Sequence, residues 1–188
     1  APASGTTNIM EYVTIMTTGN ATDFGDLTVS RSAVSGLSSS TRGIFCGGSV
    51  SGGRSNVLDY ITIANTGNAT DFGNLTATRT KTASCASPTR GVIGGGEEAD
   101  TVNKIDYITI ASTGNASDFG DLANTGKTGS ACSNNIRFVH AGGEFAGDYS
   151  NVIEYVTIAT TGNAADFGDL TLARASLSGL SNTHGGLQ

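Results

Sequence analysis

Residues 60–73, which begin Tyr60-Ile61-Thr62-Ile63 and end Asp71-Phe72-Gly73, decide the fold because nearly the same motif occurs four times in the chain. The tyrosine stands at positions 12, 60, 107 and 155, so successive copies are 48, 47 and 48 residues apart. The second half of the motif, Thr-Gly-Asn-Ala-x-Asp-Phe-Gly, recurs with it and ends at Gly25, Gly73, Gly120 and Gly168. A repeat of this length is typical of a propeller blade or of a solenoid unit.

Each repeat contains four short segments with the composition of β-strands. In the first complete repeat they are residues 35–38, 43–46, 57–63 and 72–76, and they are bounded by Gly, Asn, Asp and Ser. Four strands in about 47 residues is the size of one propeller blade. We therefore predict an all-β fold, a small four-bladed β-propeller of four-stranded blades that occupies residues 1–188 as a single domain.

The two ends of the chain fall within the same repeat. Gln188 aligns with Phe45 in the second strand of a blade, and Ala1 aligns with Ser49, just after a pair of glycines. The simplest interpretation is a closed ring whose last blade is completed by both termini. The alternative is an open excerpt of a longer array of repeats, cut in the middle of a blade.

Composition narrows the classes of partner. Charged residues make up 14% of the chain and its net charge is −6, which weighs against nucleic acid because phosphate binding needs a basic surface. No apolar run approaches the roughly 20 residues of a membrane-spanning helix, so we predict no membrane partner. Three cysteines are too few for a disulfide framework. Cys85 and Cys132 align with Leu37 and Leu180, so we expect these two cysteines to fill the core.

The sequence lacks the combinations of residues that carry chemistry. His140 and His184 are the only histidines, and neither a C-x-x-C pair nor a G-x-S-x-G motif is present. We therefore predict no catalytic residue, no bound metal and no cofactor, and we expect His140 to be a core or channel residue. The Asn and Asp side chains of the repeated turn are expected to cap backbone amides, although the same oxygens could bind calcium.

Charged residues also recur with the repeat. An acidic residue precedes every tyrosine of the motif, at Glu11, Asp59, Asp106 and Glu154. Arginines recur at the turn between the first two strands, at Arg42, Arg90 and Arg137. We expect these two sets to form ion pairs within or between blades. The alternative is a charged ring with a functional role.

Function is expected in the parts that do not repeat, because the repeated residues mostly hold the architecture. The loops between the second and third strands differ most, and in a four-stranded blade they all emerge on one face; residues 1–7 form the fourth of them. Two loops carry acidic clusters and one adds aromatic rings, a combination that suits sugar hydroxyls and pyranose faces. The candidate ligand-binding residues are Glu97, Glu98, Asp100, Glu144, Phe145, Asp148 and Tyr149. The alternative is an ordinary solvated rim of loops.

These motifs carry two resemblances. An apolar strand that ends in Gly-Gly, then a loop, a tyrosine and later an aromatic residue next to glycine, resembles the kelch repeat over the whole chain. The chain departs from kelch in a longer spacing after the tyrosine and in having phenylalanine where kelch has tryptophan, at Phe24, Phe72, Phe119 and Phe167. The run from Tyr-Ile-Thr-Ile to Asp-Phe-Gly-Asp-Leu also resembles repeats in tail-fibre and virion structural proteins of aquatic bacteriophages.

The second resemblance implies a role on a virion, and therefore a place outside the cell. We expect a non-enzymatic binding or structural module, in a tail fibre or another surface appendage, that recognises a host-surface polysaccharide or receptor through its variable loops. A purely architectural protein that docks against other virion structural proteins is the alternative. An enzyme domain that works on the propeller face is the third hypothesis.

Overall fold

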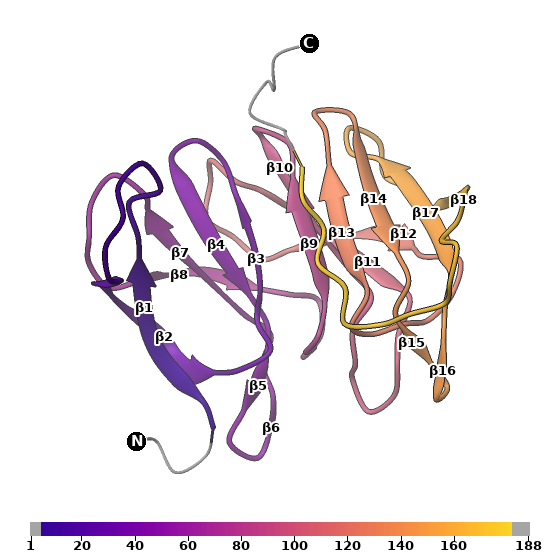
Figure 1. Ribbon diagram of the computed structural model, residues 1–188, viewed down its shortest axis with the longest axis horizontal. Coiled ribbons are helices and arrows are strands. Elements are labelled where there is room, and N and C mark those ends of the chain that lie inside the picture. Colours follow the sequence, from indigo (N-terminus) through magenta and orange to yellow (C-terminus); the bar gives the residue numbers. More distant parts are fainter. Residues whose placement is uncertain (1–4, 182–188) are drawn as a thin grey trace.

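The computed structural model describes residues 5–181, and in that range all of the regular elements are β-strands (Figure 1). This confirms the predicted all-β class. Three four-stranded antiparallel sheets account for most of the strands, and each sheet is a meander of strands that follow one another along the chain. Within the described range, no helix could span a membrane.

Each four-stranded sheet corresponds to one sequence repeat. The first sheet consists of β3 (Ser35–Ser38), β4 (Arg42–Cys46), β7 (Val57–Thr62) and β8 (Thr70–Asn74). The second sheet consists of β9 (Ala83–Ala86), β10 (Arg90–Gly94), β11 (Lys104–Thr109) and β12 (Ser117–Asp121). The third sheet consists of β13 (Ser130–Ser133), β14 (Arg137–Ala141), β17 (Val152–Thr157) and β18 (Ala165–Asp169).

The remaining strands form three two-stranded sheets. Two of them are short hairpins inserted between the second and third strands of a repeat: β5 (Ser49–Val50) with β6 (Gly53–Arg54), and β15 (Glu144–Phe145) with β16 (Asp148–Tyr149). The third, called the N-terminal sheet below, pairs β1 (Thr7–Tyr12) with β2 (Thr22–Arg31). Its strands are the third and fourth of an incomplete repeat, because β1 carries the first copy of the tyrosine motif. The predicted junction between Gln188 and Ala1 lies outside the described residues.

The strand register is the same in every repeat. The motif tyrosine lies opposite an aliphatic residue of the second strand, in the pairs Ile44–Tyr60, Val92–Tyr107 and Val139–Tyr155. In all four repeats the tyrosine ring meets the phenylalanine of the same repeat edge to face, with ring centroids 5.9 to 6.0 Å apart. The repeats of the sequence are therefore repeats of the structure.

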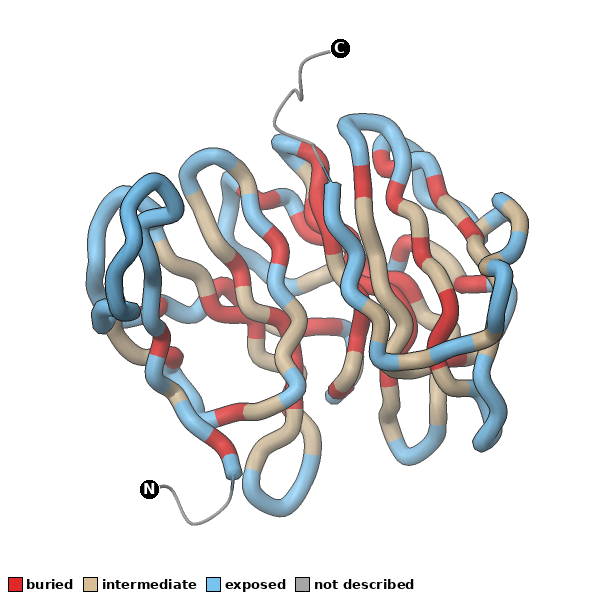
Figure 2. The backbone as a smooth tube through the Cα atoms, in the orientation of Figure 1, coloured by how far each residue is buried: buried red, intermediate tan, exposed pale blue. Residues whose placement is uncertain are grey.

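Consecutive sheets pack face to face. One apolar cluster lies between the first and second sheets and includes Phe72 and Ile108, and another lies between the second and third sheets and includes Phe119 and Phe138. A smaller cluster around Phe24 lies between the N-terminal sheet and the first sheet. The buried segments in Figure 2 accordingly run through the middle of the strands, while the turns at the upper edge are largely exposed and the loops at the lower edge are intermediate or exposed.

The same hydrogen bonds join the outer strands of consecutive sheets. A glycine N–H donates to the phenylalanine carbonyl of the preceding repeat, with N···O distances of 2.7 Å for Gly67 to Phe24, Gly114 to Phe72 and Gly162 to Phe119. The Oδ1 atoms of Asn68, Asn115 and Asn163 accept a backbone N–H of the preceding repeat, each at 3.0 Å. The turn asparagines thus cap backbone amides, as predicted, but the amides belong to the neighbouring sheet.

The innermost strands lie side by side. β9 lies between β3 and β13, and the hydroxyls of Ser84 and Ser133 donate to the carbonyls of Gly36 and Ala86. Residues 177–181 continue this series beside β13, where a Cβ on Gly179 would come within 2.5 Å of the Ala131 carbonyl oxygen. These four inner segments line a common cavity of about 210 Å³.

Candidate functional site

The candidate ligand-binding residues lie on loops between the second and third strands of the second and third repeats. The hairpin β15–β16 and its counterpart β5–β6 project from the lower edge of the molecule in Figure 1. Lys127 connects the two candidate loops, because its Nζ lies 2.9 Å from Glu97 Oε2 and 3.5 Å from Glu144 Oε1. The structure therefore brings Glu97 and Glu144 together, although they are far apart in the sequence.

Glu97 is the centre of a cross-repeat ion network. Besides Lys127, Arg54 Nη2 lies 2.5 Å from Glu97 Oε1 and Lys81 Nζ lies 3.2 Å from Glu97 Oε2. The hydrogen bond from Lys127 is the largest cause that lowers the pKa of Glu97 to about 2, followed by the hydrogen bond from Arg54. In turn, Glu97 raises the pKa of Lys127. Glu97 is thus ionised and engaged, and it acts first as a cross-link between loops.

Two other predicted residues make separate contacts. Glu98 Oε1 accepts a hydrogen bond from Lys104 Nζ of the same repeat at 2.7 Å. The exposed residue Asp100 accepts the Glu98 backbone N–H with its own backbone carbonyl at 2.9 Å. These two carboxylates are therefore not among the residues that Lys127 joins.

The β15–β16 hairpin presents the predicted aromatic residues to solvent. Ala146 and Gly147 at its tip have φ values of 49° and 90°, as a two-residue type I′ turn requires. Phe145 is 45% exposed and Tyr149 is 64% exposed. Glu144 lies opposite Tyr149 and Phe145 lies opposite Asp148. Because side chains alternate along a strand, each face of the hairpin carries one aromatic ring and one carboxylate.

Sequence reasoning missed the basic residues of this region. Arg54, Lys81 and Lys127 lie around Glu97 and Glu144, so the network holds three cations and two carboxylates. Lys81 stands where other repeats have Ala33 and Thr128. The sequence did contain a signal, because a basic residue stands at a position where the other repeats have none.

Two of the recurring acidic residues, Asp59 and Asp106, form buried ion pairs with arginine, but the predicted arginine partners are wrong. Arg31 Nη2 lies 2.5 Å from Asp59 Oδ2, Arg79 Nη2 lies 2.5 Å from Asp106 Oδ2, and all four side chains are fully buried. Arg31 ends the last strand of its repeat and Arg79 follows the last strand of the next, and each also donates to a carbonyl of the repeat after its own, Gly47 and Gly95 respectively. We call these two ion pairs the arginine clamps.

The arginines of the first turn have another role. Arg42 and Arg90 donate from Nη1 to the carbonyls of Ile110 and Ile158 in the following repeat, both at 2.8 Å. Their guanidinium carbons lie 4.7 and 4.4 Å from the centroids of the Tyr60 and Tyr107 rings. Strand register explains the correction: Arg42 lies opposite Thr62, whereas Asp59 lies opposite Phe45, about 10 Å along the strand.

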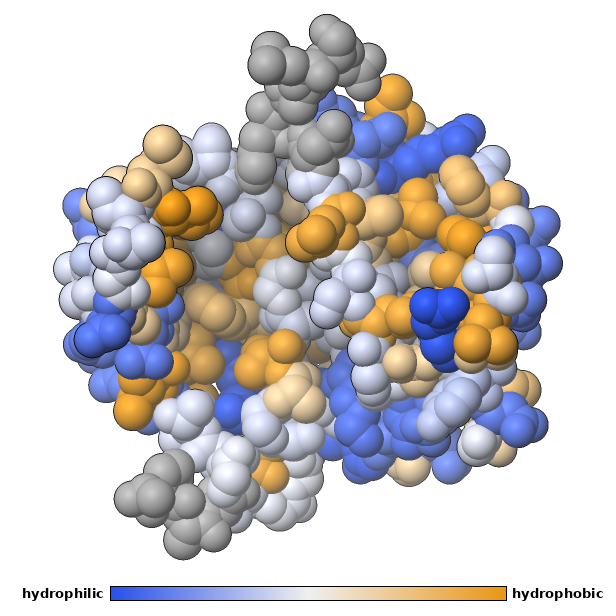
Figure 3. All heavy atoms as spheres, viewed as in Figure 1, coloured by the Kyte–Doolittle hydropathy of each residue, from blue (hydrophilic) through white to orange (hydrophobic). Residues whose placement is uncertain are grey.

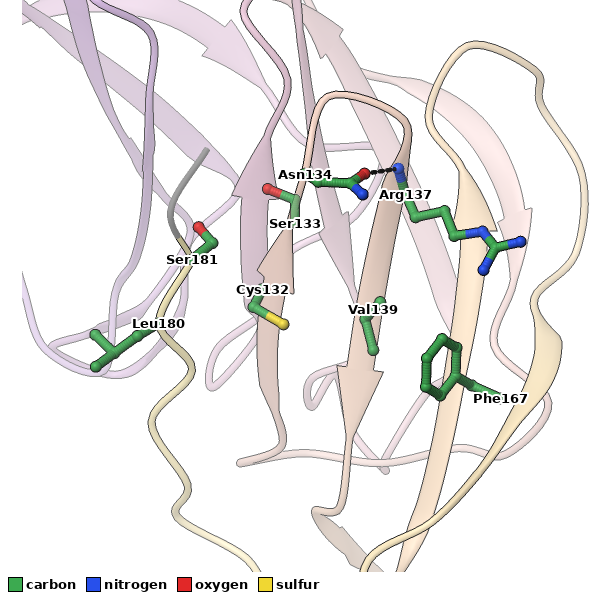
Figure 4. A pocket seen from close by; sticks show the side chains of 8 residues that line it. All are labelled: Cys132, Ser133, Asn134, Arg137, Val139, Phe167, Leu180 and Ser181. Atoms are coloured by element: carbon green, nitrogen blue, oxygen red, sulfur yellow. Dashed lines mark hydrogen bonds between the residues drawn. The ribbon is translucent and has the colours of Figure 1, made fainter. Parts of the chain in front are cut away.

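The cysteines are free thiols in different environments. Cys46 and Cys85 are buried, and burial raises the pKa of each thiol to about 12, so both are poor nucleophiles. Cys132 is only partly buried and borders a cavity of about 730 Å³, beside Val139, Phe167 and Leu180 (Figure 4). The predicted core role holds for Cys85 and only in part for Cys132.

No protein-family model matches the chain, and no curated protein matches it. Among residues 5–181, no three His, Cys, Asp or Glu side chains gather as metal ligands would.

Proposed function

We propose that the chain is a non-enzymatic binding module built as a β-propeller, with four kelch-like blades of about 47 residues per chain. The last of these blades is completed by segments from both chain ends. The arrangement is supported by the joint that recurs between consecutive sheets and by the four inner segments that border one cavity. Four-stranded blades set radially around a central channel have this geometry.

The proposed place of this module is a bacteriophage virion, outside the cell, in a tail fibre or another surface appendage. Its proposed partner is a host-surface polysaccharide or receptor. The resemblance of the repeats to those of virion proteins supports the location. The division between a repeated scaffold and non-repeating loops supports a recognition role, since binding residues are commonly carried on loops that a rigid scaffold positions.

The β15–β16 hairpin is the observation that carries this proposal. It places an exposed ring next to an exposed or half-buried carboxylate on each of its faces. A tyrosine or phenylalanine offers a flat apolar surface at a small cost in side-chain entropy, and a carboxylate accepts the hydroxyl hydrogens of a sugar.

Binding to purified bacterial surface polysaccharides, capsular and lipopolysaccharide O-chains, tests the proposal. Titration of the intact chain against such a panel should give saturable binding to at least one member. Phe145→Ala and Tyr149→Ala should each weaken that binding by about tenfold, because a truncated aromatic anchor costs on the order of 1–2 kcal/mol. Ile136→Ala is the matched control, since Ile136 is an exposed apolar residue on the turn between β13 and β14.

An architectural role is the second candidate, and a different observation favours it. Phe167 of the third sheet and Leu180, which follows that sheet in the chain, are exposed around the cavity of about 730 Å³. Extended exposed apolar surfaces mark interaction sites. Failure of every polysaccharide to bind, with the hairpin variants indistinguishable from the intact chain, would leave this candidate and remove the first.

A further inference from the structure

Every joint between consecutive sheets has two different sides. In all three joints the preceding repeat supplies a phenylalanine carbonyl. In two of them it also supplies an arginine that reaches an isoleucine carbonyl, and in two it supplies the arginine of a clamp. The following repeat supplies the glycine N–H, the asparagine side chain, the isoleucine carbonyl and the acidic residue of the clamp. We call the first side of a sheet its tail face and the second side its head face.

The tail face of the third sheet is uncovered. It consists of Arg137, Phe167, Gly168, Asp169 and Arg174, which align with joint residues of the earlier repeats. Phe167 is 54% exposed, whereas its counterparts in the first two sheets are 2% exposed. A Cβ on Gly168 would meet nothing within 4 Å, whereas one on Gly120 would come too close to the Gly162 carbonyl oxygen. The cavity of Figure 4 lies on this face, and Figure 3 shows apolar residues gathered over the third sheet.

The head face of the N-terminal sheet is uncovered as well. It consists of Glu11, Val13, Ile15, Gly19 and Asn20. Ile15 is 94% exposed, whereas the isoleucines that align with it in the second and third sheets are 2% exposed. Val13 is exposed where those sheets bury an aliphatic residue. The two ends of the described chain therefore carry the two halves of one joint.

The charges on these two faces are complementary. Arg174 aligns with the buried arginines of the clamps but is exposed, and it donates to the carbonyl of Leu172 at 3.2 Å. Glu11 aligns with the buried carboxylates and is also exposed. Neither has an ion-pair partner within the described residues. If the two faces met, Arg174 and Glu11 could form an ion pair like those of the arginine clamps.

We propose that the uncovered tail face binds the uncovered head face of a second copy of this chain. The expected contacts are an ion pair between Arg174 and Glu11, a hydrogen bond from Arg137 to the Ile15 carbonyl, and one from the Gly19 N–H to the Phe167 carbonyl. The Asn20 side chain accepts the Asp169 N–H. This inference rests on the proposed propeller blades and is independent of the proposed ligand. It differs from closure within one chain in that the two end segments of the shared blade come from different copies.

A second copy fits better than the chain's own N-terminal sheet. The tail face of that sheet is held against the first sheet by the Gly67–Phe24 hydrogen bond and by the Arg31–Asp59 clamp, which fix the position of the sheet and leave its head face uncovered. In Figure 1 it lies at the opposite side of the molecule from β17 and β18. Contact between unlike faces is heterologous, so copies joined in this way close into a ring or continue as a fibre. A ring of two copies would have eight blades, which is within the range of known propellers.

Charge exchange at one ion pair tests the proposal with the intact chain. Light scattering after size exclusion should give wild-type protein a mass at least twice the chain mass of 18.9 kDa. Arg174→Glu alone and Glu11→Arg alone should each weaken self-association tenfold or more, because like charges then face each other. An equimolar mixture of these two variants should associate again. In that mixture the carboxylate introduced at position 174 of one variant meets the guanidinium introduced at position 11 of the other, and the second joint keeps its native pair.

The controls distinguish a specific loss of self-association from misfolding of the variants. They also distinguish association of two copies from a ring that closes within one chain. Asp118→Arg changes an exposed charge on β12, away from both faces, and should leave the mass unchanged. Circular dichroism of both charge variants should match the wild type, because the two side chains are exposed. Wild-type protein that stays at 18.9 kDa at high concentration, or a mixture that fails to associate, would overturn the proposal. Neither result would bear on polysaccharide binding by the hairpin.

Discussion

The first two sheets and the third sheet place different partners beside the same buried carboxylate. In the first two, an arginine from the preceding repeat forms the clamp. In the third, Gly126 takes the place of that arginine, and His140 Nδ1 lies 3.4 Å from Glu154 Oε1 instead. His140 aligns with Phe45 and Ile93, so the substitute comes from a neighbouring strand of the same sheet.

Each of the three sheets therefore provides a partner for the buried carboxylate, but the residue that serves as the partner differs. Glu154 is one methylene longer than Asp59 and Asp106, and it accepts the Ala123 N–H at 2.6 Å. Gly129 makes room for the imidazole, because a Cβ at this position would clash with His140 Nε2. The third sheet thus differs from the others by a set of coupled changes.

Removal of an arginine clamp is expected to have the largest effect. Arg79→Ala leaves Asp106 buried without its cation and also removes the hydrogen bonds to the Gly95 and Lys104 carbonyls. We expect a loss of about 3–5 kcal/mol in the free energy of unfolding, measured by urea denaturation. A loss below about 1 kcal/mol would show that the clamp is dispensable.

The matched change in the third sheet should cost less. His140→Phe keeps an aromatic ring like that of Phe45 and removes only the partner of Glu154. Because His140 Nδ1 makes no hydrogen bond, we expect a loss of about 1–3 kcal/mol in the same urea experiment. A loss equal to that of Arg79→Ala would mean that the two arrangements are energetically equivalent.

The room made by Gly129 gives the next prediction. Gly129→Ala should cost about 1–3 kcal/mol, because the added Cβ would displace the buried His140 ring. Gly36→Ala, also near an inner strand, meets only the Ile44 carbonyl oxygen at 3.7 Å and should change stability by less than about 0.5 kcal/mol. Thermal unfolding of the two variants, measured side by side, checks this difference. Equal shifts of the unfolding midpoint would contradict the coupling between Gly129 and the His140 ring.

The exposed ion network around Glu97 should have the smallest effect, and one that depends on pH. The pKa of Glu97 is lowered from 4.5 to about 2, so its contribution to stability is present above pH 4.5 and is lost as the pH falls toward 2. Glu97→Gln should remove that part of the acid dependence and cost less than about 1 kcal/mol at neutral pH. Urea titrations from pH 6 to pH 2 should show a flatter decline for the variant. Equal slopes would mean that other carboxylates dominate.

Much of the fold could be predicted because the sequence repeats. The tyrosine motif at a spacing of 47 or 48 residues located all four repeats, and the residues between the motifs indicated four strands for each complete repeat. Turn residues behaved as their chemistry predicts: Asn68 and its counterparts cap backbone amides. The amides that they cap lie in the neighbouring sheet, and one repeat taken alone cannot reveal that contact.

The candidate site was only partly predictable. The exposed rings of Phe145 and Tyr149 followed from a loop that departs from the repeat. The cations around Glu97 did not, because Arg54, Lys81 and Lys127 come from different loops of two repeats and meet only when the sheets pack. The arginine partner of Asp59 was predicted wrongly for a related reason. Arg31 and Arg42 recur equally well in the sequence, and only the packing between sheets selects Arg31.

The sequence by itself determined the all-β class, the repeat and the loops that vary, since these depend on local strand propensity, turn chemistry and comparison of one repeat with the next. Tertiary structure alone decided which charges meet, which face of each sheet is buried, and that two complementary faces remain uncovered at the ends. The physical reason is that a sheet buries its side chains against a neighbour from another repeat. Burial and charge pairing are therefore properties of the joint between repeats.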